Sequence, residues 1–106
     1  MDERIICASI CYKELPLIRN DIPSNLFRPK NISVGIVFSG HRHVHCLYQM
    51  VVMTGKRQDE AGEEVQGLLT NLNRFVDRYE AAEIALKCGQ IEKLNYGSRL
   101  FSEDLY

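Results

Sequence analysis

The clearest alternation of apolar and polar positions in this chain runs from Ile32 to Ser39. On an extended backbone, the apolar side chains at every second position would lie in a row on one side: Ile32, Val34, Ile36 and Phe38. A period of two is typical of a strand with one buried face. We therefore predict a half-buried strand over residues 32–39, ending at Ser39-Gly40.

An earlier strand is predicted over Arg4–Tyr12, a run rich in isoleucine and small residues without helical spacing. The segment 13–30 that follows contains all three prolines of the chain. Because proline donates no hydrogen bond to a sheet, this segment is expected to be a loop, with a short helical turn near Ser24.

Residues 40–55 predict a helix. Four apolar residues fall at helical spacing and are expected to form its buried face: Val44, Leu47, Tyr48 and Val51. Gly55 follows where a left-handed C-terminal cap belongs. An unbroken strand over the same residues would be unusually long, so the helix is favoured.

The second half of the chain starts with an acidic loop over residues 58–64. Two short strands, 65–70 and 74–76, are then predicted around the turn Asn71-Leu72-Asn73.

A second helix follows, with Asp77 as its N-cap, Glu80 in the position of a capping box and Gly89 at its end. Its buried stripe is expected to contain Ala81, Ile84, Ala85 and Cys88. The predicted order is β-β-α-β-β-α, an α+β fold with a small, mainly antiparallel sheet and two helices in one domain over residues 1–106.

Composition narrows the class of partner. The 106 residues carry a formal net charge of −1, which argues against binding to duplex nucleic acid through a basic surface. No run approaches 18 apolar residues, and the opening Met1-Asp2-Glu3-Arg4 does not resemble a signal peptide, so we expect no membrane partner and a cytoplasmic location. The four cysteines are expected to be free thiols.

All three histidines lie within five residues, at positions 41, 43 and 45. On a strand they would share one face and could bind zinc, whereas on a helix only His41 and His45 do so. Cys46 beside His45 could form a thiol–imidazole dyad, but neighbours on a helix point about 100° apart. Phosphate-binding loops, GxSxG and spaced acidic pairs are missing from the sequence, so we expect no enzyme and no cofactor.

Two polar groups could bind an anion. Ser39-Gly40 precedes a helix start, and Arg42 stands there against the helix dipole. The second group surrounds the start of the other helix and contains Asn73, Arg74, Phe75, Asp77 and Arg78. Lys93, Tyr96 and Arg99 could close the same pocket. The simpler alternative makes Asp77 a cap, Phe75 a core residue and the arginines solvated.

The motifs SGHRH, QGLLT, NRFVDRYEAAEIALKCGQI and LFSEDLY, in this order, resemble the phage Thoeris anti-defence sponge family over residues 32–106. The resemblance implies a homo-oligomer, a dimer or dimers assembled into a hexamer, in the cytoplasm of the infected bacterial host. Such proteins capture glycocyclic ADP-ribose, made by TIR-domain immune enzymes, without degrading it. Some members also bind cyclic trinucleotides, the signals of CBASS-type immunity.

The resemblance also implies roles for single residues. Asp77 matches a nucleotide-contacting position, and Arg99 matches a basic residue that binds the pyrophosphate. Leu68 stands where relatives have a stacking phenylalanine, and Arg42 of SGHRH matches a second, cyclic-oligonucleotide site. The complete set of candidate ligand-binding residues is Arg42, His43, Leu68, Asn73, Arg74, Phe75, Asp77, Arg78 and Arg99. An inhibitor of a host defence protein and a small zinc-binding domain remain the alternative functions.

Overall fold

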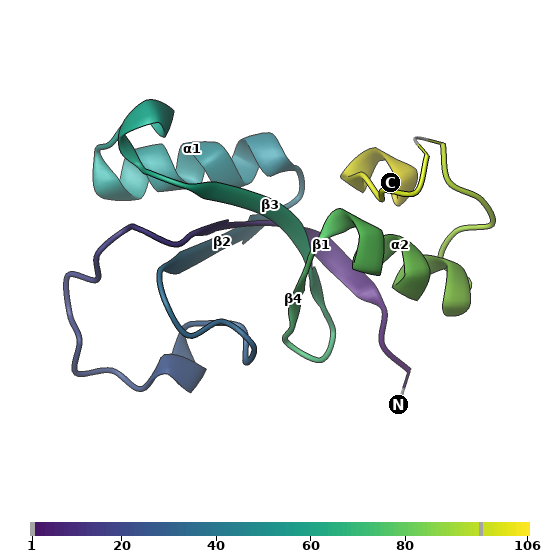
Figure 1. Cartoon of the computed structure of the whole chain (residues 1–106), viewed down its shortest axis with the longest axis horizontal. Coiled ribbons are helices and arrows are strands. Elements are labelled where there is room, and N and C mark those ends of the chain that lie inside the picture. Colours follow the sequence, from purple (N-terminus) through teal and green to yellow (C-terminus); the bar gives the residue numbers. More distant parts are fainter. Residues whose placement is uncertain (1, 96) are drawn as a thin grey trace.

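The computed structural model describes residues 2–95 and 97–106. Its sheet has four antiparallel strands in the order β2-β1-β3-β4 (Figure 1). The elements along the chain are β1 (Ile5–Tyr12), β2 (Ile36–Gly40), α1 (His43–Thr54), β3 (Glu64–Thr70), β4 (Phe75–Val76) and α2 (Arg78–Lys87). The α+β class and the order β-β-α-β-β-α are confirmed.

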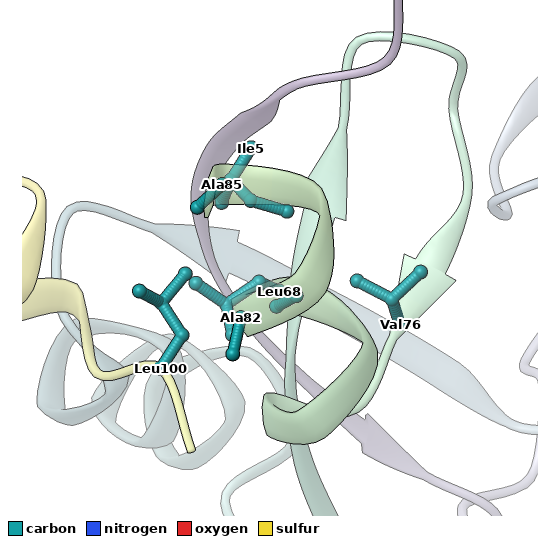
Figure 2. Packing of buried hydrophobic residues seen from close by; sticks show 7 residues of the cluster. Ile5, Leu68, Val76, Ala82, Ala85 and Leu100 are labelled. Atoms are coloured by element: carbon teal, nitrogen blue, oxygen red, sulfur yellow. The ribbon is translucent and has the colours of Figure 1, made fainter. Parts of the chain in front are cut away.

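Both helices pack on the same face of the sheet, each over its own group of apolar side chains. Beneath α2, the sheet contributes Ile5, Leu68 and Val76, and the helix contributes Ala81, Ala82 and Ala85. Figure 2 shows how these side chains meet Leu100 from the C-terminal segment. Because these helix residues are alanines, with small side chains, the backbone of α2 can lie close to the sheet.

Beneath α1, the sheet contributes Ala8, Ile10 and Tyr12, which lie under Cys46 and Met50 of the helix. This differs from the predicted apolar face. Val44 and Tyr48 are exposed, by 51% and 60%, while Leu47 and Val51 are only partly buried. Apolar residues surround most of this helix, so their spacing alone could not select the side that meets the sheet.

The second strand begins at Ile36, four residues later than predicted. Gly35 has a φ of +83°, and a Cβ atom at this position would lie 2.4 Å from the Tyr12 carbonyl oxygen. Instead of joining the sheet, residues 33–35 bind the Arg28 side chain, which donates to the carbonyl oxygens of Ser33 and Gly35 at 2.9 Å each. The left-handed glycine therefore ends the pairing with β1.

The predicted loop and its short helical turn at Ser24–Leu26 are confirmed. The loop ends at the opposite edge of the sheet, where the Asn31 amide pairs with the backbone of Phe75. Phe75 N–H donates to Asn31 Oδ1 at 2.8 Å, and Asn31 Nδ2 donates to the Phe75 carbonyl oxygen at 2.7 Å. A side chain thus satisfies the outer edge of the two-residue strand β4.

Local signals around the second helix are mostly confirmed. Asn73 has a φ of +58° and closes the predicted turn between β3 and β4. Asp77 caps α2 by accepting from the Glu80 backbone N–H at 2.8 Å, although the Glu80 carboxylate binds Arg74 instead of completing the capping box. Gly89 has a φ of +81°, and the N–H of Gln90 reaches back to Ala85, which is the Schellman pattern.

The structure also bears on the expectations about membrane-spanning helices and cysteines. None of the helices in residues 2–95 and 97–106 is long and apolar enough to span a bilayer. The four cysteines are free thiols in the structure.

Candidate functional site

The C-terminal segment 100–106 lies between the starts of the two helices (Figure 1, yellow beside α1 and α2). It contains a short 3-10 turn, Ser102–Asp104. Arginines at the first turn of each helix contact this segment, Arg42 before α1 and Arg78 at the start of α2. The C-terminal segment, which is distant from both helix starts in the sequence, therefore contacts one arginine from each of the two candidate anion-binding groups.

Arg78 contacts the C-terminal segment, the sheet and an aromatic ring. Its Nη1 donates to the Leu100 carbonyl oxygen at 3.1 Å, and its Nη2 donates to Gln66 Oε1 at 2.7 Å. Its guanidinium carbon lies 4.2 Å from the centre of the Phe101 ring. In the part of the chain that the structure describes, no carboxylate lies within ion-pair distance of Arg78. Burial lowers the pKa of Arg78, and the nearby Arg99 acts in the same direction, while Glu103 opposes it.

His43, the first residue of α1, lies between Arg78 and the sheet. Its Nε2 is 2.7 Å from the Gly67 carbonyl oxygen, and its Nδ1 is 3.4 Å from Arg78 Nη2. Burial is the main cause that lowers the pKa of His43 below its ordinary value of 6.5, and the Arg78 charge adds to it. The imidazole is therefore neutral near pH 7.

Arg42 contacts the end of the C-terminal segment. Its Nη2 donates to the main-chain oxygen of Tyr106, and its guanidinium carbon lies 5.1 Å from the centre of the Tyr106 ring. Its Nη1 is buried, has no hydrogen-bond partner within the described residues and lies 3.9 Å from Glu103 Oε2. The preceding Ser39-Gly40 belongs to β2, where Gly40 pairs with Ala8, so it is a strand end rather than an open loop.

Arg74 belongs to a separate ion-pair group. Its guanidinium binds Glu3 by two hydrogen bonds of 2.8 Å and Glu80 by one of 2.9 Å. The hydrogen bond from Arg74 lowers the pKa of Glu3 to about 2. Two carboxylates therefore neutralise this arginine, and its contacts are those of a structural bridge between the N-terminus, the β3–β4 turn and α2.

The other candidate residues around the start of α2 face different ways. Leu68 has no exposed surface, and Phe75 packs over Gly67 with 8% of its surface exposed. Neither the leucine side chain nor the phenylalanine ring is therefore available for stacking on a base. Asn73 forms the turn, and Asp77 is exposed but serves as the helix cap. None of these four residues therefore presents an exposed ring or a positive charge to a ligand.

The aromatic ring that accompanies the arginines is Phe101. Arg99 is exposed, and its guanidinium carbon lies 5.4 Å from the centre of that ring, on which Arg78 also packs. Lys93 is exposed as well, and Tyr96 lies outside the described residues. Sequence patterns gave no role to Gln66 or Phe101, and the only signal for them was their place in the motifs QGLLT and LFSEDLY.

The histidine cluster does not converge on one point. The rings of His41 and His45 are 5.9 Å apart between centres, whereas His43 turns toward Gly67, as its place on a helix predicts. Among the described residues, no group of three His, Cys, Asp or Glu side chains is placed to hold a metal ion. His45 Nδ1 accepts from the Arg42 backbone N–H at 3.0 Å and so caps α1.

Cys46 is fully buried against β1, and burial raises the pKa of its thiol to about 11. Its Sγ donates to the carbonyl oxygens of Ala8 and Arg42. A buried, protonated thiol is a packing residue rather than a nucleophile.

Comparison with models of known protein families identifies the family of this chain. Neither the curated proteins nor the solved structures contain a match to this chain. Residues 4–106 match the model of a family described as the phage T4 y16D protein, which covers almost the whole chain and includes every candidate site residue. The chain is a phage protein that belongs to the phage T4 y16D protein family.

Proposed function

We propose that this phage protein binds a small anionic, nucleotide-type signal molecule and holds it intact. The observation that carries the proposal is the environment of Arg78. Its guanidinium is fixed by Leu100, Gln66 and His43, all of them neutral acceptors, and it packs on the ring of Phe101.

Neutral acceptors orient a guanidinium without cancelling its charge. A phosphate or pyrophosphate that reaches the remaining N–H groups of Arg78 would gain charge-assisted hydrogen bonds, each stabilising by about 1.5–3 kcal/mol. Arg99 adds a second positive charge on the same ring, and Phe101 and the guanidinium planes offer surfaces on which a base can stack. This combination suits a ligand that carries both phosphate and a nucleobase.

Within that class, the resemblance of the motifs favours glycocyclic ADP-ribose as the ligand. A cyclic molecule with two negative charges loses little conformational entropy on binding, so a small preorganised site can bind it tightly. The second guanidinium group, Arg42 with its buried and unsatisfied Nη1, is our candidate for a cyclic trinucleotide site. Leu68, Asn73, Arg74 and Phe75 have structural contacts and are not part of the proposed site.

We further propose binding without turnover and assembly into a homo-oligomer in the cytoplasm of the infected host. A sponge needs affinity and abundance rather than an activated nucleophile. The oligomer is supported by the outer face of α1, where Val44, Tyr48, Val52 and Met53 are all more than half exposed. Contiguous apolar surface of this kind usually marks a protein–protein interface.

A thermal-shift panel tests the proposal directly. The purified protein is incubated with glycocyclic ADP-ribose, cyclic trinucleotides and linear ADP-ribose, and a ligand at about 100 times its dissociation constant should add about 2.7 kcal/mol to the free energy of unfolding. Heating should then release the ligand chemically unchanged. Arg78→Gln is the matched variant and should lose the shift, whereas Arg74→Gln should keep it.

Four results would contradict the proposal in different ways. A degraded product would indicate an enzyme, and a panel without any shift would remove the sponge function. Co-purification of one host protein at equal stoichiometry would support the inhibitor alternative, for which the apolar face of α1 is the natural docking surface. Sedimentation of the same samples measures the oligomer, and a monomer would exclude that part.

A further inference from the structure

We propose that His43 is a positioning residue for the anion site: as a neutral hydrogen-bond acceptor it holds the guanidinium of Arg78 toward the ligand. This inference rests on the proposed function. His43 comes from α1, Arg78 comes from α2, and they meet beside Gly67 of β3, one residue before the part of β3 that pairs with β4.

The two contacts of the imidazole select one tautomer. A carbonyl oxygen only accepts, so the Nε2 that lies 2.7 Å from the Gly67 oxygen must carry a proton and donate. In the neutral ring, Nδ1 then has a free lone pair, and Arg78 Nη2 donates toward it across 3.4 Å. A neutral His43 therefore donates to the Gly67 carbonyl and accepts from Arg78 at the same time.

The surroundings keep the imidazole uncharged. Arg78 faces it from α2, and the positive end of the α1 dipole lies at the same position. The hydrogen bond to the Gly67 carbonyl, and then Glu103 of the C-terminal segment and Glu64 of β3, act in the opposite direction, but burial and Arg78 outweigh them, and the pKa of His43 is lowered. Along the chain, the titratable neighbours are His41 and Arg42, which precede α1, and His45 and Cys46 within it.

Protonation of His43 would place an N–H group against the Arg78 N–H group and two positive charges in contact. Arg78 would then move away from Gln66 and Phe101. We therefore expect acidification to weaken anion binding. A histidine that contacted the anion itself would behave in the opposite way, because its positive charge would strengthen binding at low pH. The sign of the pH dependence separates a positioning role from direct contact.

The experiment uses the full chain with His41→Asn and His45→Asn, which leaves His43 as the only histidine. Nitrogen-15 NMR should show the Nε2–H tautomer at pH 7.5 and a pKa below 6.5. The affinity for glycocyclic ADP-ribose, measured by calorimetry, should fall about tenfold once pH drops below that pKa. His43→Leu should lose about tenfold at pH 7.5, whereas His43→Asn, which keeps an acceptor near Nδ1, should bind within about threefold and without pH dependence.

Several outcomes would overturn the inference. These are the Nδ1–H tautomer, an affinity that rises on acidification, and a folded His43→Leu variant with unchanged affinity. If no ligand binds the unmodified protein, the proposed function fails, and hydrogen exchange of the Arg78 guanidinium decides the inference separately. Slow exchange that becomes fast in both His43→Leu and acid, but not in His43→Asn, supports it, and exchange insensitive to His43 contradicts it.

Discussion

Arg74 and Arg78 lie four residues apart on either side of the Asp77 cap, yet Arg74 has charged partners and Arg78 has neutral ones. Arg74 is bound by the carboxylates of Glu3 and Glu80. Arg78 is bound by an amide oxygen, a carbonyl oxygen and an imidazole nitrogen, and packs on an aromatic ring.

If the proposed function holds, the difference separates a residue that stabilises the fold from one that binds a ligand. A carboxylate partner both orients an arginine and neutralises it, so little attraction for an external anion remains. Neutral partners orient the group and leave its charge in place, which costs stability through burial but keeps the site attractive to phosphate. Two arginines only four residues apart thus have different kinds of partner, and substitutions can test whether they also differ in function.

The largest expected effect is on ligand affinity. Arg78→Gln should weaken binding of the ligand found in the panel about 100-fold, or about 2.7 kcal/mol, because its charge-assisted hydrogen bonds are lost. Arg74→Gln should change the affinity less than about twofold. Calorimetry at pH 7.5 measures both, with thermal unfolding as the check on folding. Equal losses in the two variants would break the comparison.

The second effect concerns stability in acid. Because the pKa of Glu3 falls from 4.5 to about 2 on folding, its ion pair stabilises the protein above pH 4.5, and this contribution disappears as pH falls toward 2. Allowing for partial exposure, we expect about 1–2 kcal/mol, measured by urea unfolding across this pH range.

Glu3→Gln should flatten that part of the pH profile. Asp59→Asn, which removes an exposed ion pair with Arg57, is the matched control and should leave it unchanged. A profile that stays steep in Glu3→Gln would assign the acid sensitivity to other carboxylates.

The smallest effect is expected at Arg99, which is exposed and contacts the Phe101 ring from 5.4 Å. Arg99→Gln should weaken ligand binding about threefold at low salt and less at high salt, since solvent screens an exposed charge. The exposed Arg57 provides the control, and Arg57→Gln should have no effect. A loss at Arg99 as large as that at Arg78 would mean that the exposed arginine is the principal anion contact.

Much of the fold could be predicted because its signals are local. Asp77 caps α2, Gly89 ends it, and Asn73 closes the turn between β3 and β4, each within a few residues of the position where the backbone needs it. Two expectations that were wrong have equally physical causes. Val44 and Tyr48 have the spacing of a buried face but are exposed, and Gly35 ended the strand that alternation extended to Ile32.

The candidate site was predictable only in part. Arginines near helix starts were visible in the sequence, but Arg74 and Arg78 could not be told apart, because Glu3 lies 71 residues from Arg74 and Leu100 lies 22 residues from Arg78. Phe101 and Gln66 had no pattern of their own. Their contacts with Arg78 arise only when β3 and the C-terminal segment pack beside α2.

By itself, the sequence determined the order of strands and helices, the helix caps, the turn residues and the residues able to carry charge, since these depend on local backbone conformation and side-chain chemistry. The tertiary structure decided which arginine is neutralised, which ring accompanies the other, and which face of α1 is buried. Those outcomes depend on contacts between segments far apart in the chain, and short-range spacing carries no information about them.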